Sequence, residues 1–398
     1  MMKVVQINAV HGYGSTGKIC MSIADLLTAK GHDSYILCSL AKNSAPNVMA
    51  CATPVYTKLQ AIRSRLLGNY GFNSIKETQR MLKQLAEIQP DIVHLHNLHG
   101  HDCHLGMLFS YLKKNNIKVI WTFHDCWAFA GYCTHFSMLQ CEKWKTECNA
   151  CPQRGNHSLL LDRSSELFRR KKELFTGLDL TIVTPSQWLA DLVKESFLKE
   201  YPVKVIHNGI DLSIFQPTPS DFRKKYQIPE GKQILLGVAF DWGVRKGLDV
   251  FVELAKRLDP NQYQIVLVGT NDAIDKQLQA NIISIHRTNN QQELAEIYTA
   301  VDLLVNPTRE ENYPTVNMES IACGTPVVTF RTGGSPEILD EKTGSVVTCD
   351  DLDSLTQEII RICTEKPYSV ADCLKRAENF DMNKRFEEYI QLYDDESR

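Results

Sequence analysis

Two carboxylates, Glu311 and Glu319, lie on either side of a predicted helix start. Proline is favoured in the first helical turn and threonine near the cap, so Pro314 and Thr315 mark where this helix should begin. Gly324 is expected to end it, because glycine readily takes the left-handed conformation that follows a helix. Glu311 therefore belongs to the loop before the helix, and Glu319 belongs to its second turn.

The start of this helix is suited to an anion. The backbone N–H groups of Tyr313, Thr315 and Val316 would point toward a ligand in front of the helix, and the helix dipole favours negative charge there. With a carboxylate on each side, the segment suits a ligand with phosphate in its middle and hydroxyl groups at both ends, such as a nucleotide sugar. The alternative is a surface helix with two solvated glutamates.

This stretch resembles the donor-site signature of glycosyltransferase family 4, a retaining family with the GT-B fold. The family pattern has two glutamates separated by seven residues, a helix that ends in Cys-Gly-Thr-Pro-Val-Val, and a Gly-Gly-x-Pro-Glu turn. These elements match Glu311, Glu319, 323–328 and 333–337. Where the family usually has Gly-Phe-Gly after the first glutamate, this chain has Asn-Tyr-Pro at 312–314.

The resemblance covers almost the whole chain and includes Asn-Gly-Ile-Asp at 208–211 and Arg-Lys-Gly at 245–247. It implies transfer of a sugar from a nucleoside-diphosphate donor to a saccharide or lipid-linked saccharide in bacterial surface polysaccharide synthesis. His124 and Glu311 would contact the transferred sugar, and Lys246 would neutralise the departing diphosphate. The residues it assigns to donor binding are Gly14, Arg245, Lys246, Arg287, Asn312, Tyr313, Pro314, Thr315, Val316 and Glu319.

Arg245 and Lys246 also stand out without the resemblance. The helix dipole disfavours cations at a helix start, so two adjacent cations at this position favour an anionic ligand. The alternative is ordinary solvated charge.

The composition narrows the class of protein. A chain of 398 residues with 43% hydrophobic residues can form two domains, and a formal net charge of −3 argues against a general nucleic-acid binder. No run of about 20 apolar residues predicts a transmembrane helix, and the N-terminus resembles a first strand rather than a signal peptide. We therefore expect a cytoplasmic protein whose 13 cysteines are thiols or metal ligands rather than disulfides.

Short apolar runs alternate with helical patterns through both halves of the chain, which is typical of buried parallel strands covered by helices. We expect an α/β protein with two Rossmann-like, doubly wound domains that face each other across a cleft, as the GT-B resemblance implies. The expected parts are an N-terminal acceptor-side domain (1–209) with a cysteine-rich insertion (126–152), a nucleotide-sugar-binding domain (210–375) and a C-terminal helix (376–398) that packs on the N-terminal domain. Residues 210–219 are the expected linker. The expected strands are Val4–Ala9, Tyr35–Ser39, Ile92–His96, Val119–Phe123, Thr181–Thr184, Val203–His207, Ile234–Ala239, Gln264–Gly269, Ile282–His286, Leu303–Asn306, Val327–Phe330 and Ser345–Thr348.

A glycine-rich loop, HGYGSTGK at 11–18, follows the first expected strand. It matches the dinucleotide fingerprint G-x-G-x-x-G, but Cys38 and Ser39 replace the acidic residue expected after the second strand. It nearly matches a P-loop, but Ile19 replaces the serine or threonine that binds magnesium. A loop that lets the backbone approach the donor phosphate, as in GT-B enzymes, fits better, and a tight turn without a ligand is the alternative.

His124 and Asp125 follow a strand and resemble a His-Asp pair that family members place against the donor sugar. The imidazole could donate a hydrogen bond to a sugar hydroxyl while Asp125 orients the ring; the alternative is a histidine satisfied within its loop. The neighbouring histidines match no strong metal template, so structural or acceptor-side roles are favoured for His94, His96, His99, His101 and His104.

Four cysteines fall within nineteen residues and predict a structural zinc site. Clustered thiolates suit tetrahedral zinc, and a C-x-x-C pair is typical of one half of such a site. Cys126 is an alternative ligand, and unliganded buried thiols are the alternative to a metal site. The expected ligands are Cys133, Cys141, Cys148 and Cys151.

Two basic segments, 58–83 and 168–175, suit a peripheral contact with an anionic membrane at the inner face, and a solvated helix face is the alternative. The D-x-D pair at 351–353 lies late in the chain at an expected helix start, so no catalytic metal or other catalytic cofactor is expected. The sequence thus predicts a metal-independent retaining glycosyltransferase with no nucleic-acid partner. The alternatives are a nucleotide-sugar epimerase or hydrolase of the GT-B type and an inactive nucleotide-sugar-binding relative.

Overall fold

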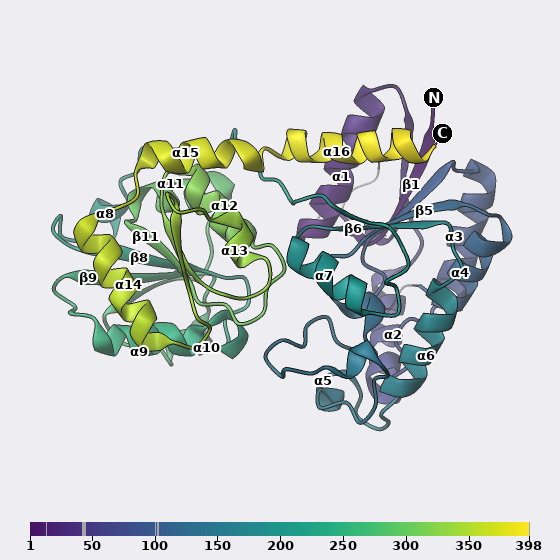
Figure 1. Ribbon diagram of the computed structural model, residues 1–398, viewed down its shortest axis with the longest axis horizontal. Helices are drawn as coiled ribbons and strands as arrows, with labels where there is room; N and C mark the ends of the chain where they lie inside the picture. The colour runs from purple at the N-terminus through teal and green to yellow at the C-terminus, as the bar shows by residue number, and fades with distance from the viewer. Residues whose placement is uncertain (13, 42–44, 100, 102, 398) are drawn as a thin grey trace. The chain divides into compact units, whose positions relative to one another are not determined.

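The computed structural model describes all residues except 13, 42–44, 100, 102 and 398 (Figure 1). The described chain forms two compact units, which are Met1–Ile206 with Phe386–Arg398, and His207–Arg385. The division falls after Ile206 rather than after residue 209. Residues 210–219, expected as the linker, belong to the second unit, where Ile210 pairs with Asp381.

The first unit is built on a parallel seven-stranded sheet with strand order β3-β2-β1-β4-β5-β6-β7. Its interior strands β4 and β6 are buried at every position, as expected of parallel strands that are covered on both faces. The strands are β1 (Lys3–His11), β2 (Asp33–Ala41), β3 (Val48–Ala50), β4 (Ile92–Leu95), β5 (Lys118–Thr122), β6 (Leu180–Thr184) and β7 (Val203–Val205). The α-helices are α1 (Gly14–Ala29), α2 (Pro54–Leu67), α3 (Ile75–Ile88), α4 (Leu105–Lys114), α5 (Arg154–His157), α6 (Ser164–Phe175) and α7 (Gln187–Glu195).

The second unit is built on a parallel six-stranded sheet with strand order β10-β9-β8-β11-β12-β13. The strands are β8 (Gln233–Val238), β9 (Tyr263–Val268), β10 (Ile282–Ile285), β11 (Leu303–Asn306), β12 (Val327–Phe330) and β13 (Gly344–Val347). The α-helices that begin in this unit are α8 (Phe222–Lys225), α9 (Leu248–Arg257), α10 (Asp272–Asp275), α11 (Gln291–Ala300), α12 (Thr315–Ala322), α13 (Ser335–Ile338), α14 (Leu352–Glu365), α15 (Val370–Ala377) and α16 (Met382–Glu396).

The two parallel sheets confirm the predicted fold class. All twelve expected strands are present with each end within two residues, and the short edge strand β3 was not expected. Apolar side chains from strands and helices form one core cluster in the first unit and two in the second. Within the described part of the chain, every helix is too short or too polar to span a lipid bilayer.

The last residues of α16 complete the first unit. Tyr393 Oη lies 2.6 Å from His94 Nδ1, and Tyr389 Oη lies 3.2 Å from Thr122 Oγ1. Thr181 Oγ1 donates a hydrogen bond to Glu396 at 2.7 Å. These contacts bury polar groups of β4, β5 and β6 under the end of α16, so the helix satisfies hydrogen bonds that the sheet alone cannot.

Candidate active site

In the second unit, the loop after β11 lies against the 3₁₀ turn Val244–Lys246 that precedes α9. The carbonyl of Arg245 accepts hydrogen bonds from Arg309 N at 2.9 Å and from Thr308 Oγ1 at 3.3 Å. Gly247 has φ +75°, and a Cβ there would lie 2.5 Å from the Pro307 carbonyl oxygen. Only glycine allows this close approach of the two segments.

This approach brings Lys246 and Glu311 together. The Lys246 ammonium donates to the Glu311 carboxylate in an ion pair, and the two side chains are 20% and 21% exposed. Lys246, which is expected to neutralise the diphosphate, is therefore in contact with Glu311, which is expected to hold the sugar. The contact is partly buried. Both residues could be predicted from the sequence, but their contact could not.

Arg309 was not predicted, and it holds the loop in place. Its guanidinium donates two hydrogen bonds to Asp249, each at 2.8 Å, and one to Asp350 at 2.6 Å. The hydrogen bond from Arg309 lowers the pKa of Asp249, and Arg309 has its own pKa raised chiefly by the same bond. No sequence motif links Arg309 to Asp249 or to Asp350, which lie 60 and 41 positions away in the chain.

Helix α12 begins at Pro314 and Thr315, as predicted. Pro314 is the cap residue and Thr315 is the first helical residue, because Pro314 has an extended conformation with ψ 118°. The Tyr313 side chain is buried and stacks on His207 with ring centroids 4.8 Å apart, and burial raises the pKa of Tyr313 to about 12. Tyr313 and Pro314 are therefore packed into the unit, and only their backbone can face a ligand.

The glycine turn at 333–334 supports the loop that carries Glu311. Gly334 N donates to the Asn312 carbonyl at 2.7 Å. Gly333 has φ +53°, and a Cβ there would lie 1.7 Å from the Glu311 carbonyl oxygen. The Gly-Gly turn is thus required for the close approach of two backbone segments.

Glu319 lies in the second turn of α12, as predicted. Its carboxylate accepts a hydrogen bond from Tyr298 Oη at 3.0 Å. Tyr298 is fully buried, and burial together with the Glu319 charge raises its pKa well above the usual value. Two residues earlier, Asn317 accepts a hydrogen bond from Asn306 of β11 at 2.8 Å, which ties the helix to the sheet.

The other residues that the resemblance assigns to donor binding lie on separate segments of the chain. Arg287 is exposed on the segment after β10, and Thr315 and Val316 are half-buried in the first turn of α12. Gly14 begins α1 in the first unit with φ +69°, and Tyr13 of the same loop is outside the described residues.

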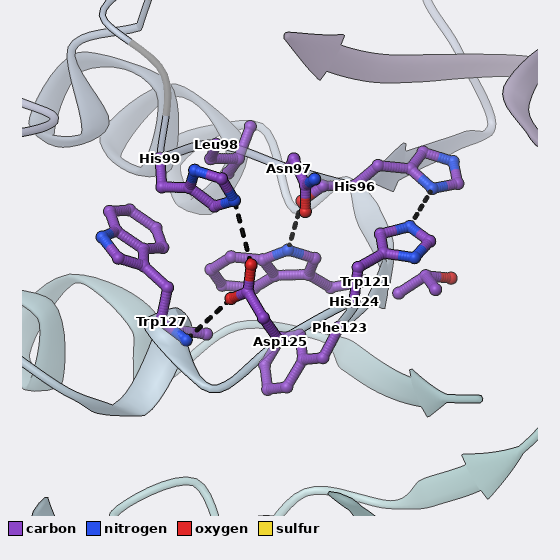
Figure 2. Close-up of a pocket in the computed structure, with 11 residues that line it drawn as sticks. His96, Asn97, Leu98, His99, Trp121, Phe123, His124, Asp125 and Trp127 are labelled. Carbon is purple, nitrogen blue, oxygen red and sulfur yellow. Dashed lines mark hydrogen bonds and ion pairs between the residues drawn. The ribbon is translucent and has the colours of Figure 1, made fainter. Parts of the chain in front are cut away.

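In the first unit, a pocket lies at the ends of β4 and β5 (Figure 2). His124 is stacked on His96, and His124 Nε2 lies 3.2 Å from His96 Nδ1. Burial lowers the pKa of His124 to about 4, although the nearby Asp125 charge partly opposes this. His124 is therefore neutral at physiological pH and can donate or accept one hydrogen bond at each ring nitrogen.

Asp125 has partners that the sequence did not predict. Its carboxylate lies 3.0 Å from His99 Nε2 and accepts a hydrogen bond from Trp127 N at 2.9 Å (Figure 2). Asp125 was expected to orient the His124 ring, but this ring is hydrogen-bonded to His96 instead, so His96 orients it. His94, the next residue inward, is bonded to Thr122 and Tyr393, as expected of a structural histidine.

The four predicted zinc ligands lie in the same region of the first unit. The nearby Cys151 thiol raises the pKa of Cys133, and Gly131 N donates to Cys148 Sγ at 3.3 Å. The thiols of Cys141 and Cys148 are close enough to raise the pKa of Cys133. Among the described residues, however, only the exposed Asp272, Asp275 and His286 bring three ligand atoms within 4.8 Å of one another, so the cysteine sulfurs are too far apart to hold zinc in this arrangement.

The predicted D-x-D pair is engaged elsewhere. Asp351 caps α14 by accepting a hydrogen bond from Ser354 N at 3.0 Å, and Asp353 forms an ion pair with Arg257. The pair thus lies at a helix start, as predicted, where Asp351 caps α14 and Asp353 connects α14 to α9.

Two family models match the chain. Residues 16–214 match the model described as Glycosyltransferase Family 4, and residues 232–365 match the model described as Glycosyl transferases group 1. The chain belongs to glycosyltransferase family 4. The family 4 match spans the first unit from α1 onward, and the group 1 match spans the sheet of the second unit, so the two units of the structure correspond to the two matched models.

Relatives of this family 4 chain agree with the assignment. It is 26% identical over 358 residues to the putative colanic acid biosynthesis glycosyl transferase WcaC of Escherichia coli (strain K12), covering 87% of this chain and 81% of that one. Its structure is similar to sucrose-phosphate synthase from Thermosynechococcus elongatus, with 17% identity, a TM-score of 0.72 and 99% of both chains covered. It is also similar to Anabaena Alr3699/HepE in complex with UDP, with 14% identity, a TM-score of 0.68 and 99% and 100% covered. These similarities confirm the predicted GT-B fold.

Proposed function

We propose that the protein is a retaining glycosyltransferase that moves a sugar from a nucleoside-diphosphate sugar to a saccharide or lipid-linked saccharide during synthesis of a bacterial surface polysaccharide. The name of the Escherichia coli relative supports the polysaccharide, and the UDP and UDP-glucose complexes of HepE support the donor class. The observation that carries the proposal is the ion pair between Lys246, on the turn before α9, and Glu311, on the loop that leads to α12 and Glu319.

Each end of this segment suits one part of the donor. Glu319 would accept hydrogen bonds from the ribose hydroxyls, since a carboxylate can bind a vicinal diol with its two oxygens. The N–H groups of Thr315 and Val316 would face the diphosphate at the positive end of α12. Glu311 would position the transferred sugar, and His124 would contact the same sugar through a neutral ring nitrogen.

Negative charge on the departing diphosphate would be neutralised without a catalytic metal. Lys246 and Arg245 supply two cations on the turn before α9, and the start of α12 supplies backbone donors. When the donor binds, Lys246 would exchange its contact with Glu311 for the diphosphate, which leaves the Glu311 carboxylate to accept bonds from sugar hydroxyls. Retention would follow from attack on the same face as the leaving group, with the departing phosphate accepting the acceptor's proton.

The test is incubation of the full chain with a panel of nucleotide sugars, with and without saccharide acceptors. A transferase should release free nucleotide quickly only when an acceptor is present, and should do so in the presence of a chelator. Release of nucleotide with a free or epimerised sugar and no acceptor requirement would instead show a hydrolase or epimerase. Donor binding without turnover would show an inactive relative.

We also propose a structural zinc on Cys133, Cys141, Cys148 and Cys151. Their clustering supports it, and so does the N–H bond from Gly131 to Cys148, because such bonds commonly support metal-bound thiolates. This zinc would fix the insertion and take no part in transfer.

A further inference from the structure

Helix α2 exposes its apolar side chains instead of burying them. Four of these side chains fall within about 60° of the helix circumference at 100° per residue. They are 40–71% exposed, whereas the residues that α2 buries are the polar Gln60 and Ser64. An ordinary surface helix has the opposite arrangement. The exposed stripe is formed by Val55, Leu59, Ile62 and Leu66.

A loop of three leucines extends this stripe. Leu159, Leu160 and Leu161 are 47–62% exposed, and Leu159 N donates a hydrogen bond to the Arg65 carbonyl near the end of α2 at 2.9 Å. The segment just before this loop is held in place, because Tyr70 Oη donates a hydrogen bond to the His157 carbonyl at 2.7 Å. We refer to the α2 stripe and residues 159–161 together as the leucine surface; α2 and α5, which precedes the loop, are labelled in Figure 1.

The leucine surface is flanked by positive charge. At helical spacing, Lys58 and Arg65 lie along one side of the stripe and Arg63 lies along the other. No aspartate or glutamate occurs between Asp33 and Glu77, although the whole chain has a formal net charge of −3. Apolar side chains bordered by cations match the chemistry of an anionic lipid surface, in which acyl chains lie beneath negative headgroups.

We propose that the leucine surface docks on an anionic lipid bilayer, with the apolar stripe in the interface and the flanking cations at the headgroups. A second copy of the chain is a less favourable occupant, because pairing the surface with itself would bring like charges together. The other basic segment, 168–175, does not provide such a face. There the Lys171 ammonium is buried and donates to the carbonyls of Trp127 and Ala130 at 2.7 and 2.9 Å. The proposal deepens the proposed function, since it would bring the enzyme to lipid-linked acceptors.

The test is co-sedimentation of the full chain with phosphatidylcholine vesicles that contain or lack phosphatidylglycerol, without any sugar donor. We expect binding only to the anionic vesicles. The double variant Leu59→Ser/Ile62→Ser should bind about ten-fold less tightly or worse. Neutralising Lys58 and Arg63 with glutamine should weaken binding about five-fold per charge and reduce its salt dependence. The matched control Ile360→Ser/Val370→Ser removes two exposed apolar side chains from the second unit and should bind normally.

Three outcomes would overturn the proposal. They are an absence of binding to anionic vesicles, an equal loss in the control variant, and a concentration-dependent dimer of the wild type that Leu59→Ser/Ile62→Ser abolishes. The last would show that the surface covers a second copy. Calorimetry with a nucleotide sugar on the same preparations separates this test from the proposed function, because donor binding depends on the second unit.

Discussion

The Lys246 ammonium forms an ion pair with the Glu311 carboxylate, although the two residues are 65 positions apart in the chain. In this partly buried site each charge neutralises the other, so neither side chain is left as an uncompensated charge. The ion pair therefore holds both side chains in place before a donor binds.

Replacing Lys246 with alanine should lower kcat about 100-fold, because the diphosphate charge that develops during transfer would lose its nearest cation. Steady-state kinetics with an accepted donor and acceptor would measure this. Lys256→Ala is the matched control, since Lys256 is an exposed lysine on α9 paired with Glu253. A normal kcat in Lys246→Ala would exclude the proposed role.

Replacing Glu319 with alanine should weaken donor binding about ten-fold or more, because a charged hydrogen bond is worth roughly 1.5–3 kcal/mol. Isothermal titration calorimetry with the donor nucleotide would measure the Kd. Tyr298→Phe removes only the hydrogen bond that supports the carboxylate and should have a smaller effect. Equal affinities of wild type and Glu319→Ala would contradict ribose binding at this residue.

Replacing His124 with alanine should lower kcat about 100-fold if the ring contacts the transferred sugar. Because burial lowers its pKa to about 4, the ring is neutral above that pH and protonates only below it. The pH–rate profile of the wild type should therefore show no inflection from His124 between about pH 5.5 and 8. His32→Ala serves as a control outside the pocket, and normal turnover in His124→Ala would refute the contact.

Replacing Gly333 with alanine should abolish or severely reduce donor binding. Its φ of +53° and the approach of a Cβ to within 1.7 Å of the Glu311 carbonyl would force the two segments apart. The strained conformation alone costs on the order of 1–3 kcal/mol, which a thermal melt would detect. Gly243→Ala is the matched control, because Gly243 has an extended conformation and nothing within 4 Å of its Cβ position. Similar melting temperatures and donor affinities for both variants would count against this account.

Protein purified without chelator should contain about one zinc per chain if the four cysteines bind it, and a strong chelator should lower its Tm. Plasma emission spectrometry would give the metal content. Cys148→Ser should lose zinc, whereas Cys349→Ser, which changes a partly exposed cysteine of the second unit, should keep it. Zinc-free protein with a normal Tm would remove the metal from the proposal and leave the transferase untouched.

The fold could be predicted because its strands are continuous apolar runs, which a parallel sheet covered on both faces requires. β3 escaped prediction because it is short and lies at the edge, where Val48 and Met49 are only partly buried. The start of α12 at Pro314 and Thr315 could be predicted because proline is favoured at the beginning of a helix, where its missing N–H costs no hydrogen bond.

Local spacing could also predict the two glutamates and the cations of the donor segment. It could not predict partners from distant parts of the chain, such as Arg309 with Asp249 or Tyr298 with Glu319. It also could not show which face of α2 is buried. The mixture of basic and apolar residues is compatible with either orientation, and only the packing of Gln60 and Ser64 decides it.

The hydrogen bonds between the first sheet and Tyr389, Tyr393 and Glu396 affect the order of synthesis and folding. The ribosome must translate the entire second unit before it makes the residues that cover His94, Thr122 and Thr181. A nascent chain that ends at residue 206 would therefore leave polar side chains of β4, β5 and β6 without these partners, and this part of the first unit would stay open to chaperones. Folding of the first unit is in this sense a late event, even though most of its sequence comes first.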